Sequence, residues 1–294
     1  MYITVFTATY NRAHTLPRLY ESLRCQSYEN FEWLIVDDGS SDNTEELVQG
    51  FLGEKPPFSI VYVRNKHGGK HRAINKGLDV AKGELFFLVD SDDYLTKHAL
   101  ETVIKWVKEI PDRTECAGLC GMMSDEHGSP IGTQFEQDFL YMTLIDMMKL
   151  GITGDRANIF FTEIFKKYKY PEFPGEWHIA PGVPHVRMAK DGYKLLFFNE
   201  IIYIAEYMQD GLTRMGDKKI IDNFKGYTLR TRELLELDIG ARRKVEIMGK
   251  YTYLGRRLGL SYREICENVS INSIQAFIFG TLASLFYSIR GESL

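Results

Sequence analysis

The chain reads Leu85-Phe86-Phe87-Leu88-Val89-Asp90-Ser91-Asp92-Asp93 at its most informative point. Five consecutive apolar residues are typical of a strand that is covered on both faces of a parallel sheet. Short polar residues follow at once, and ligands of open α/β sheets bind beyond the carboxyl ends of the strands. The stretch therefore predicts acidic groups at a ligand-binding edge. Taken alone, a solvated acidic turn that caps the next helix is an equal alternative.

Strand and helix patterns alternate on both sides of this stretch. We expect strands at Tyr2–Ala8, Glu32–Val36, Ser59–Arg64 and Leu85–Val89, with helices at Thr15–Cys25, Gly69–Lys82 and Thr96–Glu109. A further helix is expected after Asp42, which stands three residues before Glu45 in the spacing of a capping box. Less regular strands are expected at Cys116–Met123, Ala157–Phe161 and Leu195–Phe198. Repeated strand–helix units predict an α/β fold with a mainly parallel sheet and flanking helices.

The other strand ends also carry polar groups. The segments in question are Thr7–Arg12, Asp37–Asp42 and Lys66–Lys70. Because parallel strands end at one edge, these groups are expected to converge with the Asp90–Asp93 cluster. Carboxylates gathered there would repel one another unless a cation balanced them. Hard oxygen ligands suit Mg²⁺ or Mn²⁺, and these ions also bind phosphate oxygens, so we predict a metal–diphosphate site.

These residues carry a family resemblance. It rests on Thr9–Arg12, Gln26, Phe31–Ser40, Gly68–Lys70 with Ala73 and Asn75, and Asp90–Asp93. In that order and spacing the chain resembles a family 2 glycosyltransferase with the GT-A fold, of the kind that builds bacterial capsular and exopolysaccharides. The resemblance is close over residues 1–110 and looser to residue 211, through Phe173–Glu176 and Asn199–Glu200.

The resemblance implies roles in binding a nucleotide sugar, with a UDP-sugar expected. Tyr10 would stack on the base, Asp38 would hydrogen-bond it, and Lys70 would approach the diphosphate. Thr7 is predicted as a further nucleotide contact. Asp90 would lie near the ribose.

The resemblance also implies a metal-dependent, inverting transfer. Asp90 and Asp92 are the predicted metal ligands, with Mn²⁺ or Mg²⁺ as the cofactor. The acceptor would be a saccharide or a lipid-linked saccharide. The Gln-x-x-Arg-Trp signature of processive members is absent from the sequence, which favours single additions.

The general base is where the sequence departs from the family. The family places an acidic residue six positions before an arginine that opens a helix, here Arg187, and this chain has Pro181 there. Glu176 is the favoured substitute, with His178 and His185 behind it. That none of the three is the base stays open. The alternative function is therefore a non-catalytic module that binds a nucleotide sugar. A nucleotidyltransferase and a dinucleotide dehydrogenase are set aside, because the glycine-rich loops they need do not follow the first strand.

Charge divides the chain into two parts. The net charge is −4, but residues 212–263 hold 13 Lys and Arg against six Asp and Glu. The overall balance gives no indication of nucleic-acid binding. The basic stretch precedes the apolar run Ala276–Phe286, and together they suit an interfacial helix on an anionic membrane. An ordinary helical appendage or a homo-oligomer contact is the equal alternative.

The expected organisation is a catalytic domain over residues 1–211, with a nucleotide-sugar half at 1–110 and an acceptor half at 111–211. A helical region over 212–294 follows it. The four cysteines suit buried, reduced thiols better than a zinc site. Neither a leader peptide nor a membrane-spanning run is evident in the sequence, so we expect a cytoplasmic protein, with the inner face of the membrane as a possible site.

Overall fold

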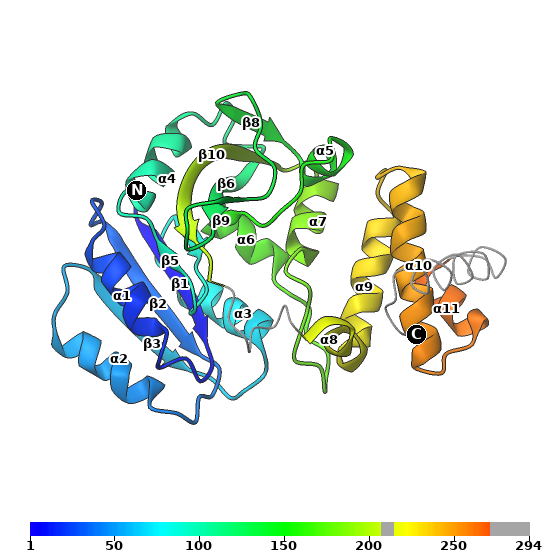
Figure 1. Cartoon of the computed structure of the whole chain (residues 1–294), viewed down its shortest axis with the longest axis horizontal. Coiled ribbons are helices and arrows are strands. Elements are labelled where there is room, and N and C mark those ends of the chain that lie inside the picture. The colour runs from blue at the N-terminus through cyan, green and yellow to red at the C-terminus, as the bar shows by residue number, and fades with distance from the viewer. Residues whose placement is uncertain (207–214, 271–294) are drawn as a thin grey trace. The chain divides into compact units, whose positions relative to one another are not determined.

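The structure, a computed structural model, describes residues 1–206 and 215–270 of the 294-residue chain (Figure 1). The chain forms two compact units that interleave along the sequence. The first unit contains Met1–Glu172 and Arg187–Gln209, and the second contains Phe173–Val186 and Asp210–Leu294. The short piece 173–186 thus groups with the C-terminal region and not with the acceptor half in which the sequence placed it.

A ten-stranded sheet forms the centre of the first unit, with its main path in the order β3-β2-β1-β4-β9-β6-β10-β5. Six strands run parallel to one another: β1 (Ile3–Thr9), β2 (Phe31–Asp37), β3 (Ser59–Arg64), β4 (Leu85–Leu88), β6 (Cys116–Ser124) and β10 (Lys194–Ile204). Four run antiparallel to their neighbours: β5 (Tyr94–Leu95), β7 (Pro130–Ile131), β8 (Phe139–Met142) and β9 (Ala157–Phe161). The predicted α/β fold with a mainly parallel sheet is confirmed.

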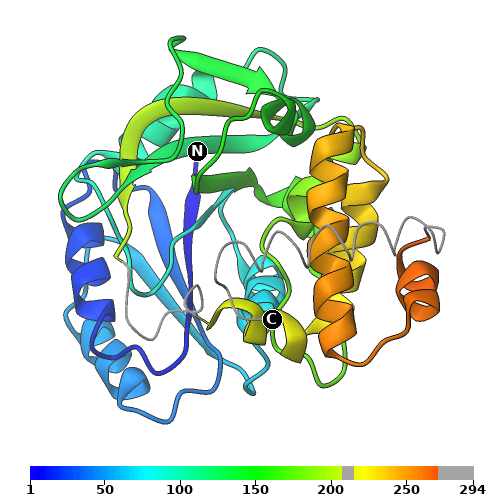
Figure 2. The ribbon, with the colours of Figure 1, turned by 45° about the vertical axis from the view of Figure 1, so that its right-hand side comes forward.

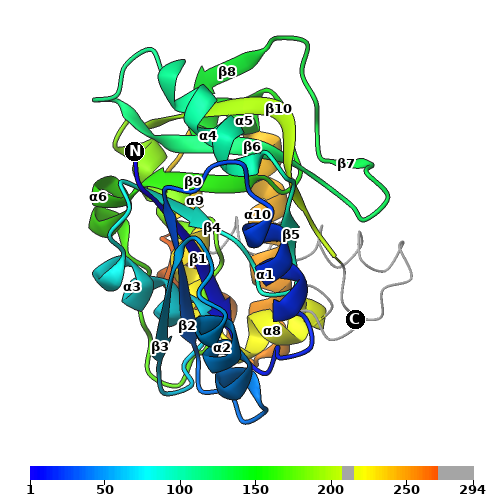
Figure 3. The same cartoon turned by 90° about the vertical axis from the view of Figure 1, so that its left-hand side faces the viewer.

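Helices cover both faces of this sheet (Figure 3). One face packs against α1 (Leu16–Arg24), α2 (Thr44–Gly53) and α4 (Ala99–Lys108) through one large apolar cluster. Within it the ring of Tyr20 stacks on Phe51 at 4.0 Å between centroids. The opposite face carries α3 (Lys70–Val80) and α6 (Thr162–Phe165), followed by the short 3₁₀ helix η1 (Lys166–Tyr168). There Phe6 stacks on Phe86 at 4.8 Å, and Phe86 meets Phe165 edge-on.

Two sequence predictions about helix starts are wrong. Helix α2 begins at Thr44 with Asn43 as its N-cap residue, and the expected box between Asp42 and Glu45 does not form. Asp42 instead accepts hydrogen bonds from the backbone and hydroxyl of Thr44, while Glu45 pairs with Arg64. Helix α4 begins at Ala99 and not at Thr96, because Thr96 is still bound to the end of β10: its backbone amide donates to the carbonyl of Ile202 at 3.1 Å.

In the part that the structure describes, the second unit consists of the loop 173–182 and of helices. It contains α8 (Gly216–Asp222), α9 (Phe224–Leu235), α10 (Ala241–Arg257) and α11 (Tyr262–Val269), and α7 (Val183–Lys190) crosses the boundary between the units in sequence. Helices α9 and α10 lie side by side (Figure 2), with Phe224 stacked on the buried Tyr251. Among the residues described, no helix is long and apolar enough to cross a bilayer. The predicted interfacial run Ala276–Phe286 lies outside them.

Candidate active site

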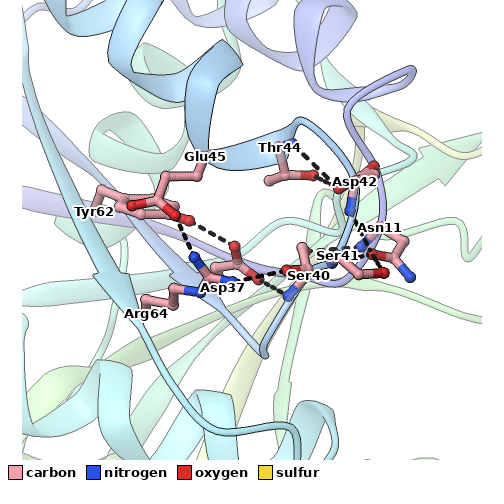
Figure 4. A network of polar contacts seen from close by, with 9 residues as sticks. All are labelled: Asn11, Asp37, Ser40, Ser41, Asp42, Thr44, Glu45, Tyr62 and Arg64. Atoms are coloured by element: carbon pink, nitrogen blue, oxygen red, sulfur yellow. Dashed lines mark hydrogen bonds and ion pairs between the residues drawn. The ribbon is translucent and has the colours of Figure 1, made fainter.

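The loops that follow β1 and β2 are joined by a polar network (Figure 4). Asn11 adopts a left-handed backbone with φ of 53°, and its side-chain oxygen accepts a hydrogen bond from the backbone of Ser41 at 2.7 Å. The backbone amide of Asn11 donates a hydrogen bond to the hydroxyl of Ser40. Asp37 closes the network, since its carboxylate accepts from the Ser40 backbone at 2.7 Å and from the Tyr62 hydroxyl at 2.6 Å. The loops that follow the adjacent strands β1 and β2 are therefore held together by the protein's own hydrogen bonds, without a ligand.

Asp38 directly follows β2 at the predicted nucleotide edge. Its side chain is only 5% exposed and accepts hydrogen bonds from the backbones of Gly68 at 3.0 Å and Gly69 at 2.7 Å. The Nδ1 atom of His67 lies 2.8 Å from the same carboxylate. Tyr10, which is 43% exposed, stacks on His67 with 4.2 Å between ring centroids. Tyr10 and Asp38 are thus brought together through His67, a residue for which the sequence suggested no role.

Thr7 is placed differently from the prediction. It is fully buried within β1, and its hydroxyl accepts a hydrogen bond from the indole nitrogen of Trp33 at 3.0 Å. A side chain with no exposed surface cannot touch a nucleotide. The structure therefore corrects the prediction for Thr7, which supports the strand under the site instead of lining it.

Lys70 connects the third strand end with the acidic cluster. It is the first residue of α3, directly after Gly69, whose φ of 99° turns the chain from the loop into the helix. Its Nζ lies 2.5 Å from Oδ1 of Asp90. Burial opposes the charge on Lys70, but the neighbouring Asp90 outweighs it and raises the pKa of the lysine. Both groups are more than a third exposed, so the pair is open to a ligand.

Three carboxylates share the turn after β4. Ligand oxygens of Asp90, Asp92 and Asp93 all lie within 4.8 Å of one another. Burial, with a further contribution from the charge on Asp90, raises the pKa of Asp92 and raises that of Asp93 to about 8. Like charges this close disfavour one another in the absence of a counterion. The donor set, all hard oxygens, fits Mg²⁺ or Mn²⁺.

Asp93 differs from its two neighbours in having both oxygens engaged by the protein. The hydroxyl of Tyr203 donates to one at 2.6 Å, and the backbone amide of Glu206 donates to the other at 2.8 Å. The amide of Asp90 in turn donates to the Tyr203 hydroxyl at 3.0 Å. Asp93 therefore ties the turn to the end of β10, which leaves Asp90 and Asp92 as the better ligands for a cation.

Glu176 lies in the second unit and is almost fully buried there. Its two carboxylate oxygens accept hydrogen bonds from the backbones of Lys225 at 2.7 Å and Gly226 at 2.8 Å. These amides belong to the first turn of α9, whose N–H groups have no partner within the helix. Glu176 thus caps α9 from a distance. Its role as general base stays a prediction.

The two candidate histidines also belong to the second unit. The backbone amides of Trp177 and His178 both donate to the side-chain oxygen of Asn223, at 2.7 and 2.8 Å. His185 lies in α7 with Nδ1 3.3 Å from the carbonyl oxygen of Pro181, and burial lowers its pKa to about 4. At neutral pH this imidazole is therefore uncharged.

Comparison with known proteins identifies the family. The model of the family described as glycosyl transferase family 2 matches residues 4–169, which contain the ends of β1, β2, β3 and β4. The chain belongs to glycosyltransferase family 2. A second finding agrees: the Campylobacter jejuni GalNAc(5)-diNAcBac-PP-undecaprenol β-1,3-glucosyltransferase is 31% identical over 243 residues, which cover 81% of this chain and 75% of that protein. The predicted resemblance to family 2 is confirmed.

Other relatives and solved structures match this family 2 chain over different lengths. Glycosyltransferase GlyG of Streptococcus pneumoniae is 37% identical over 107 residues, which span 36% of this chain and 35% of that protein. Among solved structures, S. aureus TarS 1-349 in complex with UDP-GlcNAc has a TM-score of 0.60 at 20% identity, over 87% of this chain and 73% of that one. Mannosyltransferase PcManGT from Pyrobaculum calidifontis, with GDP-Man and Mn²⁺, has a TM-score of 0.54 at 18% identity, over 99% and 76%. These likenesses show the fold of the family 2 chain.

Proposed function

We propose that this family 2 member transfers a sugar from a UDP-sugar to a saccharide or lipid-linked saccharide, with inversion and with the aid of a divalent cation. The carrying observation is that Asp38 follows β2, Asp90 and Asp92 follow β4, and Lys70 begins α3, so that all four stand at one edge of the sheet. The family match supports the transferase activity. The relatives in complex with UDP-GlcNAc and GDP-Man support a nucleotide-sugar donor.

The donor would lie along the edge formed by the ends of β2, β1 and β4. Tyr10 offers an exposed aromatic ring for the base. His67, which stacks on this ring, would have to move away or leave room for the base beside it. Asp38 is already positioned by two backbone amides and would add a polar contact to the base. Lys70 supplies a positive charge beside the predicted diphosphate position.

Asp92, with Asp90, would hold Mn²⁺ or Mg²⁺, which would supply Lewis-acid stabilisation of the departing nucleoside diphosphate. The remaining steps belong to the chain itself. Lys70 balances negative charge that builds up on the leaving group, and fixed strand ends position donor against acceptor. A base removes the proton of the acceptor hydroxyl as this oxygen attacks the sugar carbon from the opposite side. Glu176 remains our candidate for that base, followed by His178 and His185.

A lipid-linked acceptor is supported by one relative, whose name describes an undecaprenol-linked acceptor. The basic stretch of α10 would then face the anionic surface in which such an acceptor is embedded. The proposal also includes a cytoplasmic location at the inner face of the membrane and assembly as a homo-oligomer.

Calorimetry tests the metal-dependent donor site. UDP titrated into the protein with Mn²⁺ should bind at least about ten-fold more tightly than with a chelator, since a cation held by the carboxylates would also attract the phosphates. In Asp92→Ala the two affinities should become equal. Glu46→Ala, which removes an exposed carboxylate on α2, should behave like the wild type. Equal UDP affinity with and without metal in the wild type would refute the metal role. A panel of UDP-glucose, UDP-GlcNAc and GDP-mannose then identifies the donor.

A further inference from the structure

Arg18, in the first turns of α1, reaches across to the carboxylate turn. Its Nη2 donates a hydrogen bond to the backbone carbonyl of Asp92 at 2.6 Å. Its Nη1 forms an ion pair with the carboxylate of Glu206. The guanidinium also lies over the ring of Tyr94, 4.7 Å from the centroid. One side chain therefore contacts three separate points around the turn.

Glu206 approaches the same turn from the end of β10. Its backbone amide donates to Asp93 at 2.8 Å, so the residue holds the turn through its main chain and through its side chain. The neighbouring Ala205 amide donates to the carbonyl of Ser124 at 2.8 Å, which fixes this segment to the end of β6. The acidic turn is thus enclosed between α1 on one side and the ends of β6 and β10 on the other.

We propose that Arg18 and Glu206 are positioning residues that keep the carboxylate turn in its cation-binding shape before the cation arrives. The cluster of Asp90, Asp92 and Asp93 would otherwise open, because its charges repel each other. A guanidinium that is bound to the backbone of Asp92 and to Glu206 opposes this opening without consuming a carboxylate of the cluster. Groups that orient metal ligands from outside the first coordination sphere commonly change metal affinity about 10- to 100-fold when they are removed.

The identity of the residue matters as much as its charge. The planar guanidinium presents several N–H groups in a fixed fork, which suits a carbonyl and a carboxylate at once. A lysine has one nitrogen at the end of a flexible chain. Arg18→Lys should therefore keep the ion pair with Glu206 or the bond to Asp92, but not both in their present geometry.

A double-mutant cycle in the full chain tests this role, which rests on the proposed metal site. Arg18→Met and Glu206→Gln should each weaken binding of Mn²⁺-UDP about ten-fold, and the double variant should lose little more, since both changes break one unit. UDP binding in chelator should not change. Arg24→Met is the matched control, because Arg24 lies on the same helix, pairs with Glu21 and Glu54, and lies over the ring of Tyr20. Wild-type affinity in the single variants, or losses that simply add, would overturn the proposal.

Hydrogen exchange gives a readout that needs no metal or nucleotide. In the ligand-free Arg18→Met and Glu206→Gln proteins, the amides of Asp90 and Asp93 should exchange on the order of ten-fold faster than in the wild type, because local opening becomes easier. The amides of β2 should exchange as before. Unchanged exchange at Asp90 and Asp93 would overturn the proposal even if the metal site were real. If Mn²⁺ does not change the UDP affinity of the wild type, only the proposed metal role is refuted. The hydrogen-exchange measurement then decides by itself whether Arg18 and Glu206 stabilise the turn.

Discussion

Glu176 is a single carboxylate with a structural task that the sequence did not reveal. Its two oxygens accept N–H groups from the first turn of α9, while Asn223 at the start of that helix accepts from Trp177 and His178. The two bonds to α9 satisfy amides that no helical carbonyl can reach, and the negative charge favours the positive end of the helix dipole. Glu176 in the loop thus satisfies two backbone amides of α9, and Asn223 satisfies two backbone amides of the loop.

The substitution Glu176→Gln separates this task from catalysis. An amide nitrogen would now face a backbone N–H, so we expect the free energy of unfolding to fall by about 1–2 kcal/mol, measured by urea denaturation. If Glu176 is also the general base, kcat should fall by a factor on the order of 10²–10⁴ with UDP affinity nearly unchanged.

Asn223→Ala is the control, since it opens the same loop–helix contact and leaves the carboxylate intact. A similar fall in kcat in both variants would mean that Glu176 only shapes the loop. Near-native turnover in Glu176→Gln would move the base role to His178 or His185. Their substitution would then be the next step.

The positions of several polar residues could be predicted from local sequence pattern, and their roles stay predictions. Asp38, Lys70, Asp90 and Asp92 each follow a strand or begin a helix, and the structure gathers them around one edge. Thr7 was misjudged because burial within a strand depends on neighbours such as Trp33, which lies 26 residues away. The partners of Asp93 were not predictable for the same reason: Tyr203 and Glu206 are more than a hundred residues distant along the chain.

Packing between elements is tight at one helical glycine and loose at another. A Cβ atom on Gly77 of α3 would lie 2.2 Å from the ring of Phe6 in β1, whereas one on Gly50 of α2 would have nothing within 4 Å. Gly77→Ala should therefore destabilise the protein by about 1–3 kcal/mol, because the helix must move away from the sheet. Gly50→Ala should stabilise it by about 0.5–1 kcal/mol through helix propensity.

Thermal denaturation of the two variants checks this contrast. The melting temperature should fall for Gly77→Ala and rise for Gly50→Ala. A stable Gly77→Ala protein would show that α3 can shift on the sheet at little cost. That result would also weaken the argument that Lys70, at the start of α3, is held in a fixed place.

Whole elements were easier to predict than their directions. The apolar runs of β1 to β4 are local signals, and each strand lies within one or two residues of its expected bounds. The direction of β9 could not be predicted from the sequence. Its antiparallel pairing with β4 and β6 depends on those two strands and not on the composition of β9 itself. The expected capping box at Asp42 failed for a comparable reason, since Asp42 also accepts a hydrogen bond from the backbone of Ala13, 29 residues away in sequence, and Glu45 pairs with Arg64 of β3.

At the scale of the whole molecule, the basic stretch of the second unit is expected to bring the protein to anionic membranes. The structure tempers this expectation, because Arg242 and Arg243 both pair with Glu246 at 3.3 and 3.0 Å. Liposome flotation at low salt should show binding to anionic but not to zwitterionic vesicles. Neutralising Arg242, Arg243 and Lys244, together with deletion of residues 276–294, should abolish it. Binding that is absent, or unchanged in that variant, would assign the segment to internal packing or to a second subunit.

The interleaved path of the chain limits how this protein can be cut or recombined. Residues 173–186 belong with the C-terminal helices, although more than twenty residues of the first unit separate the two pieces in sequence. A truncation before residue 210 would leave the Glu176 loop without α9, and would expose the carboxylate and the apolar side chain of Ile179 that now packs on Gly226. A chimera with another family member must therefore exchange both pieces as one cassette. The same dependence should hold in evolution. Sequence changes in the C-terminal helices should be accompanied by changes in residues 173–186.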